Sequence, residues 1–370
     1  ENVRPKVNHE NYISESKCYI LKGAEINNGR VYSADELAMT ITNVDYDIIN
    51  QCYNWDNIYI SNVIRYHKGY LPKAIIESIL ELYQGKTELK GVDGKEVEYL
   101  LSKGMLNSVY GMSVTDVIQD NHIYTDEWDL EPANIGEQIE KYNNSKNRFL
   151  FYPWGVWVTA YARKNLWTGI LAMGDDYVYS DTDSIKLLNY HNHIEYINWY
   201  DKMTITKLEM MMEHYKLDKK LLAPKTIRGE TKMIGIWDYE GTYSRFKTLG
   251  AKRYLVEHDG KLELTVAGLS KRNGIEYMIE HCKGDYEKVF HMFNDELYIP
   301  SDKTGKMTHT YIDEEQKFMI QDYQGNESYI ITKSGIHLEP CDFTLSISKQ
   351  YGAFLKNLMQ GYFYKGVQYQ

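Results

Sequence analysis

The sequence lacks several features that would assign it to a class at once. No apolar run approaches the roughly 18 residues that a membrane-spanning helix needs, so we expect no membrane partner. Cysteine is scarce, and its four residues form no CxxC pair: Cys18, Cys52, Cys282 and Cys341. This wide spacing favours a reduced compartment over a disulfide-bonded secreted scaffold. The sequence also shows no internal repeat, which argues against a repeat protein.

What is present is typical of a large globular protein. The 370 residues, 43% hydrophobic and 25% charged, can bury a core and form two or three subdomains. The net charge is −10, yet residues 219–272 hold twelve Lys or Arg against six Asp or Glu. An acidic protein with one basic stretch can hold a polyanion on one face; the alternative is an ordinary solvated surface.

Hydrophobic periodicity predicts a mixture of helices and strands. Tight turns are expected within 177–188, between two short strands, and at Asp259–Gly260, in a hairpin over 247–269. The polar, Asn-rich segment 115–148 is expected to be a loop-rich insertion. A strand-like pattern covers 36–44, and helices are expected over 47–55, 71–86, 96–111, 155–174 and 193–215.

Two aspartates interrupt an otherwise apolar run in residues 179–184 (YSDTDS). Burying unpaired carboxylates is costly, so stability does not explain them. Alternation along a strand would send Asp181 and Asp183 to the same side of the hairpin. Carboxylates on one side repel unless a hard cation such as Mg²⁺ neutralises them, which indicates a phosphoryl- or nucleotidyl-transfer site. The alternative is a turn whose Asp, Thr and Ser side chains only hydrogen-bond the backbone.

Two further stretches carry residue types that suit nucleotides and nucleic acids. In KGMLNSVYG (103–111), Lys103, Asn107 and Tyr110 fall at i, i+4 and i+7, so they would share one helix face. A cation suits phosphate, and an amide and a ring suit base and sugar; a solvated stripe is the alternative. In LGAKRYL (249–255), Lys252 and Tyr254 would alternate onto one strand face, where they can meet a nucleic-acid backbone.

In this order, the three stretches resemble the motifs of family B DNA polymerases, specifically the protein-primed branch of phages and linear plasmids. Residues 103–111 match the finger-helix motif KxxxNSxYG, 179–184 the palm motif YxDTDS and 252–254 the KxY motif. Weaker matches are GVWVTAYAR (155–163) and AGLSK (267–271). The resemblance covers nearly the whole chain. It implies an α+β fold, with a palm of antiparallel sheet and helices, helical fingers and a small thumb.

On this resemblance the chain is the C-terminal part of such a polymerase, and its exonuclease domain is absent. The implied activity is DNA-directed DNA synthesis on primer–template DNA from dNTPs, in the cytoplasm of a bacterial host, with a terminal protein as a candidate primer. The implied regions are an N-terminal palm or insertion segment (1–70), fingers (71–113), an insertion for processivity and strand displacement (114–148), palm (149–275), and thumb with C-terminal region (276–370).

The resemblance also implies the metal and nucleotide ligands. Asp183 would bind both catalytic Mg²⁺ ions, with Asp181 close by in a supporting role and Mn²⁺ as a possible substitute metal. Lys103 would contact the incoming triphosphate. A second lysine is expected to contact the triphosphate as well, and we favour Lys86 over Lys90. The nascent base pair would be lined by Asn107, Tyr110 and Gly111.

DNA contacts are implied on two stretches. Lys252 and Tyr254 would hold the primer end, and Thr182 and Ser184 of the YSDTDS turn are expected to lie against DNA.

One motif of the family is missing. DxxSLYP, which supplies another metal-bridging aspartate and the tyrosine that excludes ribonucleotides, does not occur in residues 1–100. NDELYIP (294–300) looks similar, but it follows the palm motif, and we interpret it as chance. The chain also starts at Glu1. We therefore expect a fragment or a split subunit, whose N-terminal partner carries the exonuclease and the missing aspartate.

Three other interpretations are weaker. A catalytically inactive, DNA-binding or scaffold subunit would have no need for the metal-ligand residues. RNA-templated or template-independent synthesis stays open, because the ribose-excluding motif is absent. HNH at 191–193 has no neighbouring Cys/His cluster in the sequence, so a surface loop is expected there instead of a zinc or nuclease site.

Overall fold

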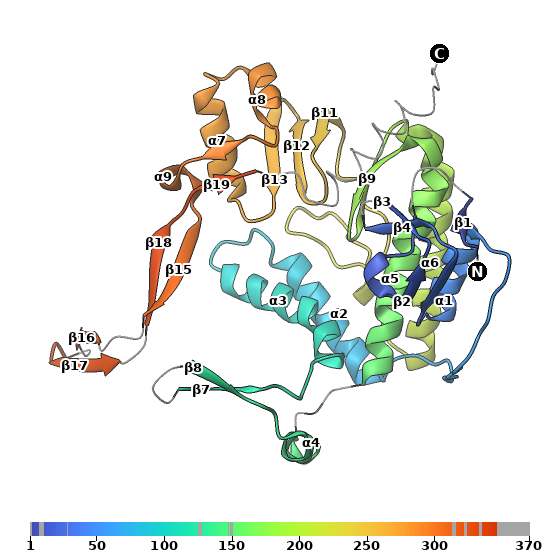
Figure 1. The fold of residues 1–370 in the computed structure, drawn as a ribbon, viewed down its shortest axis with the longest axis horizontal. Coiled ribbons are helices and arrows are strands. Elements are labelled where there is room, and N and C mark those ends of the chain that lie inside the picture. Colours follow the sequence, from blue (N-terminus) through green and yellow to red (C-terminus); the bar gives the residue numbers. More distant parts are fainter. Residues whose placement is uncertain are drawn as a thin grey trace. The chain divides into compact units, whose positions relative to one another are not determined.

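The computed structural model describes residues 2–6, 11–27, 29–124, 128–146, 148, 151–312, 316–321, 324–332 and 335–345. Helices and antiparallel strand pairs are mixed along the chain, as expected for an α+β protein (Figure 1). The chain divides into two compact units. The first holds Glu1–Ile26, Arg30–His122 and Leu130–Tyr239; the second holds Asn27–Gly29, Ile123–Asp129 and Glu240–Gln370. In the described residues, every helix is too short or too polar to cross a membrane.

The first unit begins with short strands around a small core. They are β1 (Arg4–Pro5), β2 (Cys18–Lys22), β3 (Glu25–Asn27), β4 (Arg30–Ser33), β5 (Glu36–Met39) and β6 (Tyr53–Asn54). Helix α1 (Asn43–Cys52) covers them and buries Ile48 and Cys52 against Trp167 and Ile170. The strand expected over 36–44 ends at Met39 because Thr42 caps α1 in a capping box with Asp45.

Two helices follow as an antiparallel pair, α2 (Lys73–Glu88) and α3 (Glu96–Ser113), which confirms both expected helices. The break between them uses Gly91 and Gly94, both with positive φ. In a second core, Ile76 and Leu80 of α2 pack against Met212 of helix α6 (Ile194–Tyr215) and against Leu222. The segment expected to be loop-rich contains regular structure instead: hairpin strands β7 (Asn121–Tyr124) and β8 (Trp128–Glu131), and α4 (Ile135–Asn144).

The rest of the first unit contains the turn of the YSDTDS stretch, which we call the carboxylate turn (Asp181–Ser184). The long helix α5 (Tyr152–Met173) ends at Gly174, whose φ of 55° stops it as the sequence predicts. A single turn of 3₁₀ helix leads into β9 (Tyr177–Asp181), which pairs antiparallel with β10 (Ser184–Leu187). Another 3₁₀ turn (Tyr190–His193) leads into α6 (Ile194–Tyr215).

The second unit is built on the three-stranded antiparallel sheet β11 (Tyr243–Thr248), β12 (Arg253–His258) and β13 (Lys261–Val266). Leu255 and Leu264 pack against α7 (Lys271–His281) and α8 (Tyr286–Met292), around Met278 and Phe293. The remaining elements are β14 (Tyr298–Ile299), α9 (Ser301–Thr304), β15 (Met307–Ile312), β16 (Gln316–Gln321), β17 (Glu327–Thr332), β18 (Gly335–Pro340) and β19 (Phe343–Thr344). The DxxSLYP-like stretch 294–300 belongs to this core, where Leu297 and Ile299 are buried.

Candidate active site

The YSDTDS stretch forms the tip of the β9–β10 hairpin. Asp181 pairs with Ser184, so Thr182 and Asp183 form a two-residue turn, as the sequence predicts. Because Asp183 lies in this turn and not in a strand, period-two alternation does not determine its direction, and the argument that placed both carboxylates on one side was wrong in its premise. Asp181 is partly buried at the end of its strand, whereas Thr182 and Asp183 are exposed.

The backbone of this turn is strained. Thr182 has a φ of 57°, a left-handed conformation that is unfavourable for a β-branched residue. The Asp183 amide donates to the Asp181 carbonyl at 2.6 Å, and the Ser184 hydroxyl donates to the same carbonyl at 3.2 Å. The Thr182 hydroxyl donates to Oδ1 of Asp181 at 3.0 Å. Ser184 and Thr182 thus shape the turn with internal hydrogen bonds while the Asp183 side chain points to solvent. Non-glycine residues held in this region of φ cluster at functional sites.

The donor chemistry of the turn fits a hard cation in part. Asp181 and Asp183 offer carboxylate oxygens, which Mg²⁺ prefers, and Mg²⁺ commonly uses one or two carboxylates with phosphate oxygens and water. Across the described ranges, however, no three His, Cys, Asp or Glu side chains gather into a metal-binding group. The turn can therefore supply part of a coordination shell, and further ligands must come from substrate, water or another segment.

The base of the hairpin is held by a polar clamp that we define as Asp176, Asn189 and His193. Asp176, just before β9, accepts hydrogen bonds from the Asn189 amide nitrogen at 2.8 Å and pairs with Nε2 of His193 at 2.8 Å. Its carbonyl accepts from the Leu188 amide at 2.8 Å. The contacts from His193 and then Asn189 lower the pKa of the Asp176 carboxyl. Asn189 takes a left-handed φ of 47°, which asparagine tolerates, to reach Asp176.

This clamp corrects the expectation of a surface loop at 191–193. His191 is exposed as expected, but only 12% of the His193 side chain is exposed, and it is tied to Asp176. The contact between Asp176 and His193 was hard to predict from the sequence, because the whole β9–β10 hairpin separates the two residues along the chain. The described residues still provide no zinc-binding cluster there.

Helix α5 packs against strand β10 of the hairpin. A Cβ atom at Gly169 would lie 2.7 Å from Cδ1 of Ile185, so glycine permits β10 to approach the helix closely. At the other end of α5, a Cβ atom at Gly155 would lie 2.0 Å from the side chain of Val114, which caps α3. Hence α5 packs against both the hairpin and the C-terminal end of α3.

The predicted nucleotide-binding residues lie on α3. Since residues 96–113 are helical, Lys103, Asn107 and Tyr110 share one face, and all three are exposed. Gly111 lies one residue further, near the end of the helix. The structure thus confirms the shared face.

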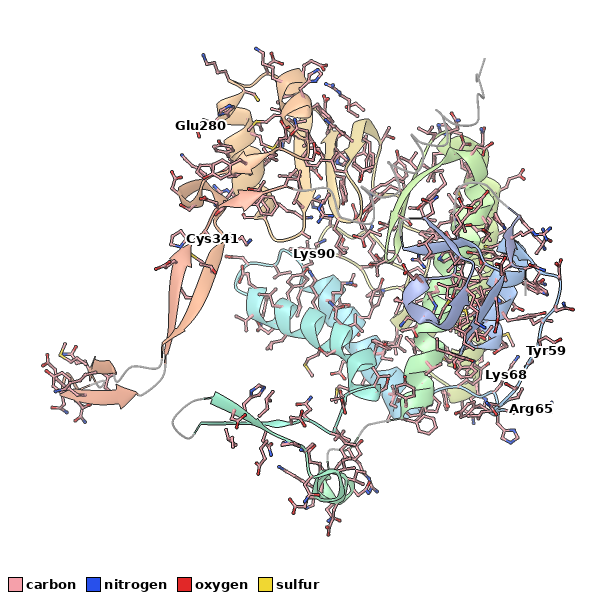
Figure 2. The ribbon with its side chains drawn as sticks, in the orientation of Figure 1. Tyr59, Arg65, Lys68, Lys90, Glu280 and Cys341 are labelled. Carbon is pink, nitrogen blue, oxygen red and sulfur yellow. The ribbon has the colours of Figure 1, made fainter. Side chains whose placement is uncertain are left out.

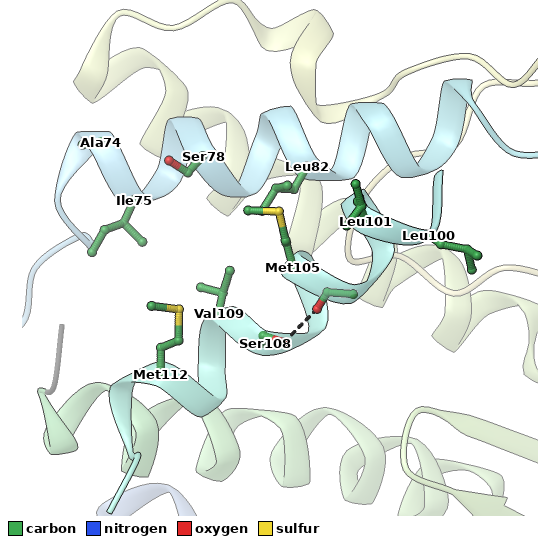
Figure 3. Close-up of a pocket in the computed structure, with 11 residues that line it drawn as sticks. Ala74, Ile75, Ser78, Leu82, Leu100, Leu101, Met105, Ser108, Val109 and Met112 are labelled. Atoms are coloured by element: carbon green, nitrogen blue, oxygen red, sulfur yellow. Dashed lines mark hydrogen bonds between the residues drawn. The ribbon is translucent and has the colours of Figure 1, made fainter. Parts of the chain in front are cut away.

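The groove between α2 and α3 is a different surface (Figure 3). It has a volume of about 550 Å³ and is almost wholly apolar, with Leu82, Leu101 and Met105 among its lining residues. The hydroxyl of Ser108 faces it but donates to the Gly104 carbonyl at 2.8 Å. Lys103, Asn107 and Tyr110 do not line this groove. A triphosphate would need cations, so the groove is not the nucleotide site that the sequence predicts.

Lys86 and Lys90 differ in their surroundings. Lys86 lies in the last turn of α2, partly buried, with its ammonium 5.9 Å from the centre of the Tyr83 ring. Lys90 lies beyond the helix end and is exposed. Lys86 is thus held on a helix and Lys90 is not, and the contact of Lys86 with a triphosphate stays a prediction.

The KxY residues lie in the second unit. Tyr254 is in β12 and stacks on Phe246, with ring centres 5.6 Å apart. Lys252 is not in the strand: it occupies the preceding turn, with a φ of 55°. The expected alternation of Lys252 and Tyr254 on one strand face was therefore wrong, because Gly250 accepts the Arg253 amide and closes a turn there.

A buried cluster that the sequence did not reveal joins α1 to α5. Asp45 is 5% exposed and accepts hydrogen bonds from Tyr12, from the Thr42 hydroxyl at 2.7 Å and from Nε of Arg163 at 2.9 Å. Burial tends to raise the pKa of Asp45, but the hydrogen bonds from Tyr12, Thr42 and Arg163 outweigh it and lower that pKa. Burial, followed by the contact with Asp45, raises the pKa of Tyr12. Asp45 is thus committed to the fold and is not a spare metal ligand.

Comparison with known proteins shows that the chain is similar to DNA polymerases of Bacillus phages. The chain is 27% identical over 237 residues to a DNA polymerase of Bacillus phage B103, and 28% identical over the same length to that of Bacillus phage Nf. The DNA polymerase of Bacillus phage phi29 is 27% identical over 237 residues. The chain is related to phage DNA polymerases. The resemblance to a phage-type polymerase is therefore confirmed.

The extent of this similarity is limited. It covers 62% of this chain and 34% of each relative, so the matched part spans about a third of the length of these curated relatives. No protein-family model matches the chain, and no solved structure matches it.

Proposed function

We propose that the chain is the fingers, palm and thumb part of a protein-primed family B DNA polymerase, which transfers nucleotides from dNTPs to a primer 3′-hydroxyl. The observation that carries the proposal is the exposed, strained Asp181–Ser184 turn, in a chain related to phage DNA polymerases. A two-residue turn that presents a carboxylate to solvent at the cost of backbone strain suits a metal-dependent transfer site.

In this proposal Asp183 and Asp181 hold two Mg²⁺ ions, or Mn²⁺ in their place. When bound, such ions activate the primer hydroxyl and stabilise the charge of the triphosphate and of the leaving pyrophosphate. The Thr182 hydroxyl orients the Asp181 carboxylate through its hydrogen bond, while Asp183 keeps its oxygens available for ligands.

The remaining site residues bind substrates. Lys103 and Lys86 neutralise the triphosphate, and Asn107, Tyr110 and Gly111 line the nascent base pair. Because Lys103, Asn107 and Tyr110 project from one face of a rigid helix, they can act on one nucleotide together. The DNA contacts are made by Lys252, Tyr254, Thr182 and Ser184.

We also propose that another carboxylate completes the site, because the described residues offer no third metal-binding side chain beside the turn. It would come from an N-terminal segment or partner that also carries the exonuclease. A terminal protein would supply the primer, and the protein would act in the cytoplasm of a bacterial host.

The test is primer extension with Mg²⁺ and all four dNTPs. The chain is assayed alone and after mixing with an N-terminal polymerase half that carries the missing aspartate. Activity only in the mixture, lost in Asp183→Asn, is the expected result. Activity that survives Asp183→Asn would contradict the proposed role of the turn.

A second candidate function follows from the same observation, that the described residues place no third metal-binding side chain beside the turn. A catalytically inactive polymerase-derived subunit would bind DNA without extending it. Absence of extension both alone and in the mixture, with primer–template binding retained, would identify this second function and exclude the first.

A further inference from the structure

The connection between β6 and α2 is unusual for its length and exposure. From Trp55 to Pro72 it contains no helix or strand, and uninterrupted connections longer than about 15 residues in compact domains are most often functional or linkers. We call residues 57–72 the connecting segment. It runs along the surface of the first unit (Figure 1).

The connecting segment is anchored at two points. The Tyr66 ring packs edge-on against Trp157 of α5, with ring centres 5.4 Å apart. Further along, the Tyr70 ring lies 5.0 Å from that of His214, and the Tyr215 hydroxyl donates to the Leu71 carbonyl at 2.8 Å. These contacts to α5 and α6 fix the C-terminal half of the segment, so its exposed side chains have a defined place on the surface.

Residues 57–70 of the connecting segment are all exposed. Tyr59 is 83% exposed, and Arg65 and Lys68 are exposed further along the segment (Figure 2). Arg65 and Lys68 form no ion pair within the described part of the chain. Four exposed aliphatic residues lie among them: Ile58, Ile60, Val63 and Ile64.

The charge of the segment has one sign. No Asp or Glu occurs from residue 57 to residue 76, in a protein with 52 acidic residues among 370. The preceding carboxylate, Asp56, is engaged elsewhere: it accepts a hydrogen bond from Asn2 at 2.8 Å and lies 3.8 Å from Arg4. An acidic protein that keeps a surface strip free of carboxylates provides a place where a polyanion meets no local repulsion.

We propose that the connecting segment binds single-stranded DNA, with Tyr59 stacking on an unpaired base and Arg65 and Lys68 contacting phosphates. Exposed rings interleaved with cations are the arrangement by which proteins hold single strands, since every base presents a face to stack on. A duplex keeps its bases stacked internally and cannot use the Tyr59 ring in this way. The choice of DNA rests on the proposed polymerase function, which this surface extends by adding a site for an unpaired strand.

The test is fluorescence anisotropy of a labelled oligothymidylate of about 20 nucleotides, titrated with the full chain at about 50 to 300 mM NaCl. In Arg65→Ala/Lys68→Ala we expect roughly tenfold weaker binding at the lowest salt. The slope of log K against log[salt] should become shallower by about 1.4, or about 0.7 for each lost phosphate contact. The matched control is Lys202→Ala/Lys207→Ala, which removes the same charge from exposed positions of α6 and should leave the slope unchanged.

The ring is tested separately. Tyr59→Ala should weaken binding at least about fivefold, whereas Tyr59→Phe, which keeps the stacking face, should bind as the parent does. A hairpin duplex of equal charge should be insensitive to both substitutions.

The results also separate this inference from its alternatives. Unchanged affinity and slope in the double variant would overturn it. So would a result in which Ile60→Asp alters the oligomeric state and the cation variants have no effect, because the strip would then serve a protein partner. Asp183→Asn should bind the oligonucleotide normally, so loss of extension and loss of strand binding report on the two proposals independently.

Discussion

In the part of the chain that the structure describes, two hairpins have two-residue turns that include aspartate, and the backbone conformations of these turns differ. In β12–β13, Asp259 and Gly260 have φ values of 49° and 69°, the left-handed pair that Asp-Gly turns adopt with little strain. In β9–β10, Thr182 alone takes positive φ, at a position where glycine is preferred. The first turn has the residues its geometry demands, and the second does not.

The surroundings of the two hairpins differ in the same way. β12 lies in the middle of a three-stranded sheet and buries Leu255 and Val256. β9 and β10 form a two-stranded sheet, which is marginal by itself, and they depend on α5 and on the polar clamp at their base. The β9–β10 turn contains residues that its backbone conformation disfavours, and tertiary contacts hold it in place. Such departures from local preference are expected at functional sites.

The largest difference between the turns is expected in activity. Asp183→Asn should lower primer extension by at least about a thousandfold in the complete polymerase, because it removes a metal-binding charge. Asp259→Asn, the matched change in the other turn, should leave the rate within about twofold, since asparagine also tolerates positive φ. Extension rates of both variants at saturating dNTP make the comparison, and equal losses would show that the two turns are equivalent.

Stability should respond in the opposite direction at the two turns. Gly260→Val should destabilise the protein by about 1–2 kcal/mol, because a β-branched residue is forced into left-handed φ. Thr182→Gly should stabilise it by up to about 1 kcal/mol, as relieved strain exceeds the entropy that glycine loses. Urea unfolding measures both values. If Thr182→Gly destabilises, the turn is not strained in the way that its φ indicates.

The polar clamp should protect the base of β9–β10 against local opening. In His193→Ala the amide of Leu188, which donates to the Asp176 carbonyl, should exchange its hydrogen roughly tenfold faster. His191→Ala, at an exposed neighbouring position, is the control and should change nothing. Exchange of the Leu255 amide reports on the other hairpin and should be unaffected by either substitution.

The smallest effect is the acid dependence of the clamp. The pKa of Asp176 is lowered in the folded protein by His193 and Asn189, so its contribution to stability is present above the ordinary carboxyl pKa of about 4. That contribution is lost as the pH falls through the lower folded pKa. The stability difference between the parent and Asp176→Asn should therefore be measurable at about pH 6 and shrink toward zero near pH 2. A difference that grew on acidification would contradict the lowered pKa.

Much of the local structure was predictable from the sequence. Hydrophobic periodicity located α2, α3, α5 and α6, and the Asp-Gly and Gly174 signals located a turn and a helix end. The YSDTDS turn was predictable for the same reason: its geometry is set within four residues. The turn at Lys252 was missed because Lys-Arg-Tyr reads as continuous strand, and the left-handed φ follows from the closing contact with Gly250.

The buried and clamped carboxylates were not predictable. Asp45 meets Arg163 across 118 residues, and Asp176 meets His193 only after the intervening hairpin has folded back. Periodicity reports which face of an element is buried but not which distant polar group will meet it there. The structure alone separates Asp45 and Asp176, whose carboxylates are used by the fold, from Asp183, whose carboxylate is exposed in the turn.

The packing of α5 has a mechanical consequence. The two glycines at which it touches the end of α3 and strand β10, Gly155 and Gly169, are separated by about 21 Å along a helix with a rise of about 1.5 Å per residue. A helix is stiff over that length. If α5 rotates by about 5° about the contact at one glycine, the contact at the other glycine moves by nearly 2 Å. A change in the tilt of α5 would therefore move both the C-terminal end of α3 and the β9–β10 hairpin that carries the Asp181–Ser184 turn.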